Sequence, residues 1–160
     1  MKLTIYSFSN KQPDWVISGT NDYLKRFTKD FSVELIDLKP ESRKTGKAIE
    51  ALLKQEAERF ISTFQKRTPK ALLVVLDEKG QNWTTTELAQ FLFQKTQDAP
   101  QIAFLIGSAD GIDSSLKQKA DLLLRLSSMT LPHGLAKILL IEQLYRAVSQ
   151  INNTPYHREG

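Results

Sequence analysis

The sequence predicts an α/β fold: one three-layer domain, residues 1–160, with a largely parallel sheet of five to six strands. Segments with the pattern of β-strands alternate with segments of helical periodicity along the whole chain. The later strand segments are continuous apolar runs, which is typical of parallel strands that are covered on both faces. A length of 160 residues fits one domain, because chains usually divide only at greater length.

In the first half of the chain, the order is strand, helix, strand, loop, helix. Alternating apolar residues predict strands over Lys2–Phe8 and Ser32–Leu38. Between them, Pro13 suits the first turn of a helix whose apolar residues keep a helical spacing. The polar segment Lys39–Lys47 contains Pro, Gly and four cations and predicts a flexible basic loop. Residues Ala48–Lys66 form the clearest amphipathic pattern of the sequence and predict a long helix.

In the second half, three short apolar strands alternate with three helices. The run Thr84-Thr85-Thr86-Glu87 is a capping box that predicts a helix to about Gln97. The other predicted elements are strands at Ala71–Asp77, Ile102–Ile106 and Leu122–Ser127 and helices at Ser114–Ala120 and Leu135–Ile151.

The last helix is apolar on nearly all sides. Such a helix needs cover on more than one face, so a homodimer through this C-terminal helix is predicted. Burial within a single chain is the alternative.

Composition excludes several kinds of chemistry. The absence of Cys rules out disulfides and thiolate sites, and two His leave little for zinc, so no metal is expected. The longest apolar runs are far shorter than a membrane span, and the N-terminus lacks the build of a secretory signal, so we expect a cytoplasmic protein without membrane contact. The net charge of +4 permits a polyanionic partner without requiring one.

Ligands of an open parallel sheet bind at the carboxyl ends of its strands. The loops at these ends lack GxGxxG and GxxxxGK[ST], which removes the usual support for dinucleotide and P-loop nucleotide binding. Gly107 and Gly111 suit a ligand loop or simple turn chemistry. Ser108 lies in a GSADG loop and not in a GxSxG elbow, so a Ser-His triad is not favoured. His133 could contact a ligand or form a hydrogen bond within its own loop, and its spacing alone favours the hydrogen bond within the loop.

The C-terminal run Pro155-Tyr156-His157-Arg158 combines an aromatic ring, an imidazole and a guanidinium. These groups suit stacking on a base and holding a phosphate, and a frayed terminus is the alternative.

Several segments of the chain, in order and at matching spacing, are those of one known family. They are Pro13-Asp14-Trp15-Val16, Tyr23-Leu24-Lys25-Arg26-Phe27, Leu105-Ile106-Gly107, Thr130-Leu131-Pro132-His133, Glu142-Gln143-Leu144-Tyr145-Arg146-Ala147 and Pro155-Tyr156-His157-Arg158-Glu159. On these residues the whole chain resembles the RlmH family, small rRNA methyltransferases of the SPOUT class.

The resemblance implies a C-terminal trefoil knot, an exception to the rule that chains avoid knots. It also implies that the knot holds the cofactor S-adenosylmethionine. The cofactor-binding residues it implies are Leu76, Gly107, Leu126, Ser127, Ser128, Met129, Thr130 and Leu131. One position departs from the family pattern: Ser108 stands where the family has a second Gly.

The activity implied by the resemblance is methylation of N3 of a pseudouridine in 23S rRNA of the large ribosomal subunit, on assembled ribosomes. The implied active site is composite: one protomer holds the cofactor, and the other supplies the tail of residues 152–160. Within that tail His157 would assist deprotonation or orient the base, Tyr156 would pack on the base, and Arg158 would hold RNA. Lys25, Arg26 and Arg146 are further RNA-binding candidates, and Lys29, Arg43, Lys44 and Lys47 could extend this footprint.

Three alternatives remain open from sequence. The first is a SPOUT methyltransferase that acts on tRNA, and the second is a non-catalytic ribosome-binding protein of the same fold, suggested by Ser108. The third is a flavodoxin-like cofactor carrier, which a coloured protein would reveal.

Overall fold

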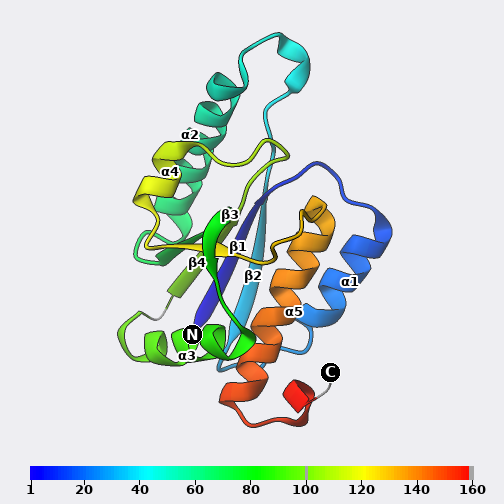
Figure 1. The fold of residues 1–160 in the computed structure, drawn as a ribbon, viewed down its shortest axis with the longest axis vertical. Helices are drawn as coiled ribbons and strands as arrows, with labels where there is room; N and C mark the ends of the chain where they lie inside the picture. Colours follow the sequence, from blue (N-terminus) through cyan, green and yellow to red (C-terminus); the bar gives the residue numbers. More distant parts are fainter. Residues whose placement is uncertain (100, 159–160) are drawn as a thin grey trace.

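A computed structural model describes residues 1–99 and 101–158 and shows a five-stranded, all-parallel sheet in the order β2-β1-β4-β3-β5 (Figure 1). The strands are β1 (Lys2–Phe8), β2 (Ser32–Leu38), β3 (Leu72–Asn82), β4 (Gln101–Ile106) and β5 (Leu122–Arg125). The helices are α1 (Asp14–Leu24), α2 (Ile49–Arg67), α3 (Thr85–Asp98), α4 (Ser114–Lys119) and α5 (His133–Ile151), with short 3-10 helices η1 (Arg43–Thr45) and η2 (Pro155–Arg158).

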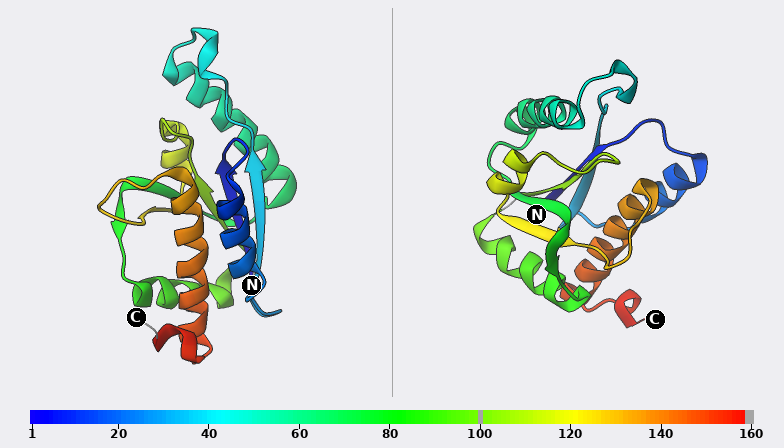
Figure 2. Two further views of the ribbon diagram at one scale, coloured as in Figure 1. Left: turned by 90° about the vertical axis from the view of Figure 1, so that its right-hand side faces the viewer. Right: turned by 45° about the horizontal axis from the view of Figure 1, so that its top comes forward.

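Helices cover both faces of the sheet, which confirms the predicted three-layer α/β class. Side chains of a strand alternate between faces, so Leu3 and Ile5 of β1 join a core with α3 and α5. Tyr6 and Phe8 point to the opposite face and join a second core with Phe60 of α2. Figure 2 shows the same division, with α2 on one side of the sheet and α1 and α5 on the other.

The apolar helix α5 lies between α1 and α3 and contacts both. It buries Leu140, Ile141 and Leu144 completely, and Tyr145 meets Phe27 with ring centroids 5.4 Å apart. The chain itself therefore covers much of this helix, and its apolar character alone does not require a second copy. The homodimer stays a prediction.

Strand β3 is longer than predicted. Its pairing with β5 shifts register between Leu76 and Gln81, so the intervening residues bulge out of the ladder. A Cβ at Gly80 would lie 2.7 Å from the backbone of Leu123 and Leu124, which explains why glycine stands at this close approach. The bulge carries Asp77 and its neighbours into the loop region above the sheet.

Most other boundaries agree with the predictions to within two residues, and the capping box of α3 is present. The predicted basic loop contains the short helix η1, which the Ser42 side chain caps. Glu159 and Gly160, the last residues of the predicted tail, lie outside the described residues. The trefoil knot stays a prediction.

Candidate functional site

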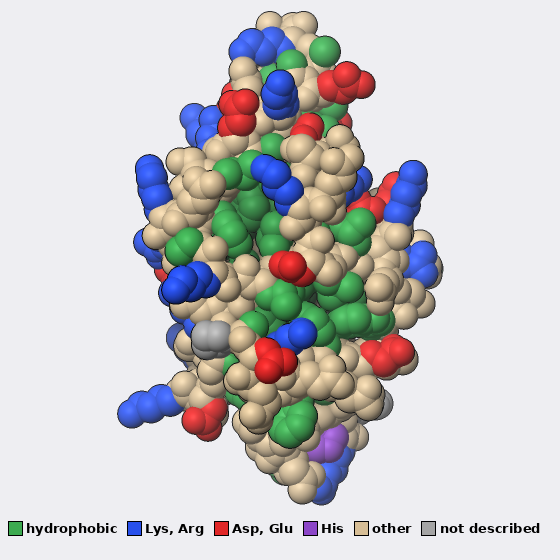
Figure 3. All heavy atoms as spheres, turned by 90° about the vertical axis from the view of Figure 1, so that its left-hand side faces the viewer, with side chains coloured by type: hydrophobic (Ala, Val, Ile, Leu, Met, Phe, Trp, Pro, Cys, Tyr) green, Lys and Arg blue, Asp and Glu red, His purple; other side chains and the backbone are tan. Residues whose placement is uncertain are grey.

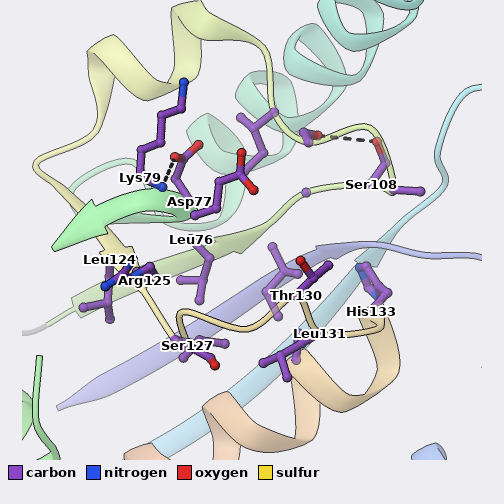
Figure 4. Close-up of a pocket in the computed structure, with 18 of the residues that line it drawn as sticks. Leu76, Asp77, Lys79, Ser108, Leu124, Arg125, Ser127, Thr130, Leu131 and His133 are labelled. Carbon is purple, nitrogen blue, oxygen red and sulfur yellow. Dashed lines mark hydrogen bonds between the residues drawn. The ribbon is translucent and has the colours of Figure 1, made fainter. Parts of the chain in front are cut away.

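A cavity of about 620 Å³ lies over the carboxyl ends of β3, β4 and β5 (Figure 4). The structure brings all eight predicted cofactor-binding residues to this one cavity: Leu76, Gly107, Leu126, Ser127, Ser128, Met129, Thr130 and Leu131. Parallel pairing explains the convergence, because the three strands end at the same edge of the sheet.

The cavity walls combine apolar side chains with unpartnered polar atoms. Leu76 and Leu131 contribute apolar surface, and Met129 is 78% exposed. Two buried nitrogen atoms of the lining have no hydrogen-bond partner among the described residues, Arg125 Nε and His133 Nδ1. Buried polar atoms without partners are uncommon in folded proteins, so Arg125 Nε is available to a hydrogen-bond acceptor, whereas the His133 ring also interacts with the backbone of Gly107.

The loop after β4 is tightly built around Gly107. A Cβ at this position would lie 2.6 Å from the carbonyl oxygen of Gly111 and would also collide with the side chain of Ile112. Ser108 and Gly111 form a small antiparallel bridge, and Gly111 has a φ of +92°, which glycine adopts without strain. The loop conformation therefore depends on both glycines.

Arg43 of η1 ties this loop to the rest of the protein. Its guanidinium donates to Ser108 Oγ at 2.9 Å, to Asp110 Oδ2 at 2.8 Å and to Glu56 Oε1 at 2.6 Å. The Ser108 hydroxyl thus has a defined partner. Arg43 is engaged within the protein, which argues against its predicted place in an RNA footprint.

Asp77 and Lys117 form an ion pair of 2.6 Å at the cavity rim. Burial alone would raise the pKa of Asp77, but hydrogen bonds from Lys117 and from the backbone N–H of Lys79 outweigh it and hold the pKa below its ordinary value. Asp77 is therefore a carboxylate at neutral pH.

His133 begins α5 and lines the cavity, although spacing alone favoured a role within its loop. Burial lowers its pKa, and the nearby Lys137 ammonium lowers it further, so the ring is neutral at pH 7. Its Nε2 lies 3.4 Å from Ser7 Oγ at the end of β1. In the sequence, His133 stands between the cavity-lining segment of residues 126–131 and the apolar helix α5. This placement is the feature that could have indicated its position in the cavity.

Tyr156 is held at the other end of α5. Its hydroxyl donates to Glu142 Oε1 at 3.0 Å, and its ring lies 4.7 Å from that of Tyr145, between centroids. The Arg146 guanidinium lies over the ring at 4.8 Å. Burial and hydrogen bonds to Tyr23 and Glu142 raise the pKa of Tyr156, so its hydroxyl stays protonated.

Ser149 fixes the next residue of the tail. The backbone N–H of His157 donates to Ser149 Oγ at 3.0 Å, and the His157 Nδ1 atom lies 3.4 Å from the same oxygen. Arg158 is exposed. The described part of the tail is therefore an ordered 3-10 helix and not a frayed end.

The cavity lies at the start of α5, where His133 and Ala136 line it. The tail follows the opposite end of this helix (Figure 1). A helix of 19 residues is about 28 Å long at 1.5 Å per residue. The structure therefore does not bring His157, Tyr156 and Arg158 to the predicted cofactor residues within one chain.

The three RNA-binding candidates gather around the tail. Arg26 pairs with Asp22 at 2.7 Å, and Arg146 pairs with Glu142 at 2.8 Å and reaches the carbonyl oxygen of Tyr156 at 3.5 Å. Lys25 is exposed at the C-cap of α1. Arg146 thus anchors the tail through Tyr156.

No helix within residues 1–99 and 101–158 has the length and hydropathy to cross a membrane. The same residues contain no group of three or more His, Cys, Asp or Glu side chains that could hold a metal ion.

The parallel sheet and the partly apolar cavity over its strand ends define an α/β protein with a site for an organic ligand. Comparisons with known proteins name the family. A family model described as a predicted SPOUT methyltransferase matches residues 1–157. The chain therefore belongs to the SPOUT methyltransferase family.

Its relatives match over the full length. The chain is 47% identical over 159 residues to the ribosomal RNA large subunit methyltransferase H of Chromobacterium violaceum, covering 99% of this chain and 100% of that one. It is 48% identical to proteins of the same name from Burkholderia vietnamiensis and Burkholderia multivorans, covering 99% of both chains in each case.

Proposed function

We propose that this protein uses S-adenosylmethionine to methylate N3 of a pseudouridine in 23S rRNA of the assembled large ribosomal subunit, in the cytoplasm. The observation that carries the proposal is the full-length similarity to proteins named ribosomal RNA large subunit methyltransferase H. The cofactor, the acceptor atom and the ribosomal substrate are our inferences from the family resemblance.

The cavity fits the proposed methyl donor. Leu76, Leu126 and Leu131 offer apolar surface for an adenine ring, and the unpartnered Arg125 Nε offers a donor for an acceptor atom of the ligand. When bound, this cofactor supplies an electrophilic methyl group.

A second copy of the chain would complete the site. The tail lies about 28 Å from the cavity along α5, so an antiparallel arrangement of two copies would place the tail of one at the cavity of the other. The beginnings of α1 and α5 expose apolar side chains suited to such contact: Trp15 is 56% exposed, and Ile17 and Leu135 are each 43% exposed.

The tail residues then take separate roles at the acceptor base. His157 accepts the imide proton or orients the base, Tyr156 stays protonated and packs on it, and Arg158 holds a phosphate. Lys25 offers a phosphate contact beside the tail, while Arg26 and Arg146 already hold carboxylates and would contact RNA from that position.

The test incubates the protein with methyl-labelled S-adenosylmethionine and, separately, naked rRNA, tRNA and ribosomes that lack the modification. Label at N3 of a large-subunit pseudouridine in ribosomes is the expected result. Label on tRNA alone would overturn the substrate, and donor binding without label on any RNA would indicate a non-catalytic ribosome-binding protein.

A matched pair of variants tests the tail. His157→Ala should reduce turnover by about 100-fold, within the range for loss of a general base, and should leave donor affinity nearly unchanged, because none of the residues proposed to bind the donor lies in the tail. His133→Ala changes the histidine inside the cavity and should weaken donor binding. Unaltered turnover in His157→Ala would remove this residue from the reaction.

A further inference from the structure

A second cavity, of about 380 Å³, lies beside the first turns of α5. The segment that follows β1 contributes the amide side chains of Asn10 and Gln12, and α1 contributes Thr20. Asp37 of β2 and Lys137 of α5 complete the polar part of its lining. Its volume falls within the range of small-molecule sites, and Ile17, proposed above to contact the second copy, also lines it.

Lys137 is a buried cation with spare hydrogen-bonding capacity. The residue is 4% exposed, and its ammonium donates to Asp37 Oδ1 at 2.6 Å. An ammonium has three N–H donors, and this is its one partner among the described residues. Thr20 is also 4% exposed, and its hydroxyl has no partner within the same residues. A ligand with several acceptor oxygens would satisfy both groups.

The second cavity adjoins the first across one turn of α5. His133 lines the first cavity and Lys137 the second, and residues four apart on a helix are neighbours about 6 Å apart. The two also interact electrostatically, since the Lys137 ammonium contributes to the lowered pKa of His133. The two cavities therefore border the same turn of α5.

We propose that the second cavity holds the acceptor, a uracil-type base, and that the Lys137 ammonium stabilises the negative charge that its imide develops. The proposal rests on the function proposed above and adds the acceptor subsite and a further catalytic residue. A uracil-type base presents two carbonyl oxygens that flank N3, which matches the donors of Lys137, Thr20 and the two side-chain amides.

The bond changes show where a cation is needed. The N3 proton passes to the His157 imidazole of the second copy and then to solvent, and the remaining negative charge spreads over the two carbonyl oxygens. The N3 electron pair then forms the bond to the methyl carbon. The carbon–sulfur bond breaks, and its electron pair stays on sulfur, which leaves as a neutral thioether. A buried ammonium beside a carbonyl oxygen favours the deprotonated base.

The test compares Lys137→Met and Lys137→Arg in single-turnover methylation of unmodified ribosomes across pH. Loss of a buried donor to a developing anion costs about 100- to 1000-fold in rate, so Lys137→Met should lose that much at pH 7 while Lys137→Arg stays within about tenfold of the wild type. The charged groups near the ammonium are Asp37 on β2 and Lys11 in the segment after β1, and the neutral, titratable His133 lies on α5; all three are retained in both variants.

The pH profile separates this role from a structural one. Without the ammonium the base must ionise unaided, so the rate of Lys137→Met should keep rising to about pH 9, above the point where the wild type levels off. Donor affinity, measured by calorimetry, should stay unchanged. Lys66→Met, on an exposed part of α2, is the matched control and should behave as the wild type. A loss in Lys137→Met that is equal at every pH, or no loss, would overturn the proposal.

A measurement without donor or ribosome tests the cavity alone. Pseudouridine nucleoside added to isotope-labelled protein should shift the backbone amide signals of Thr20 and Lys137. Absence of shifts there at millimolar nucleoside would overturn the subsite. Wild-type protein that methylates no RNA but shows these shifts would instead contradict the proposed function and leave the base-binding cavity supported.

Discussion

The loop after β4 offers a sharp test of how the first cavity is built. In Gly107→Ala, the added methyl carbon would lie 2.6 Å from the Gly111 carbonyl oxygen and would also strike the Ile112 side chain. The Ile112 side chain can turn away, but the carbonyl belongs to a backbone that Arg43 holds through Ser108 and Asp110. Relief therefore requires a shift of the loop itself.

The size of the effect follows from this overpacking. Inserting a methyl group into a tightly packed site costs about 1 to 3 kcal/mol. For a chain of this length, 1 kcal/mol corresponds to about 2 to 4 °C in Tm, so the variant should melt roughly 2 to 12 °C lower. The displaced loop lines the cavity, so we also expect binding of S-adenosylmethionine to weaken by about tenfold, or 1.4 kcal/mol.

Thermal unfolding and titration calorimetry measure the two effects of Gly107→Ala. The matched control is Gly46→Ala: Gly46 has a φ of +72° but no atom within 4 Å of an added Cβ. That control should lose about 1 kcal/mol from backbone strain and bind the donor normally. A Gly107→Ala variant that melts with the wild type and binds the donor equally well would refute the packing argument.

Three further variants test the site rim, the core and the tail. Because folding lowers the pKa of Asp77, its carboxylate stabilises the protein above about pH 4, and this effect is lost as the pH falls through the folded pKa. Urea unfolding at pH 7 should show Asp77→Asn about 1 to 2 kcal/mol less stable than the wild type. At pH 3 the difference in stability should be smaller. Phe60→Ala should cost about 3 to 5 kcal/mol, because this ring is 1% exposed and packs edge-on against Tyr6, whereas Phe93→Ala, at a 58% exposed position, should cost far less. Ser149→Ala removes the hydroxyl that holds His157 and should increase amide exchange in the tail.

Local patterns made most elements predictable. The Thr84 and Glu87 pair marks the start of α3 correctly, because a capping box acts within four residues. The strand at Lys2–Phe8 was likewise predictable, because alternation depends only on the period of a strand. Its cover on both faces, by Leu3 and Ile5 on one side and Tyr6 and Phe8 on the other, was predicted only for the later strands. The cofactor candidates converge because parallel strands end at one edge.

Contacts between segments that are far apart in the sequence could not be predicted from local patterns. Arg43 binds Asp110, 67 residues away, and Lys137 binds Asp37, 100 residues away. The sequence alone therefore places Arg43 in a flexible basic loop and assigns no role to Lys137. The extension of β3 depends on the backbone of β5 against Gly80, which no pattern within β3 reveals. Figure 3 shows hydrophobic side chains grouped along the middle of one face, between scattered charged side chains. This surface is also formed only when the chain folds.

The strand order has a consequence for how the chain folds during synthesis. β1 pairs with β2 on one side and with β4 on the other, so Lys2 reaches one of its partners only when Gln101 has been made. At about 5 to 20 residues per second, that interval lasts roughly 5 to 20 s. During it, the nascent chain has an unpaired apolar strand edge, the kind of surface that chaperones protect and that aggregates when they do not. The centre of the sheet therefore cannot close until β4 has been made, when only the edge strand β5 is still missing.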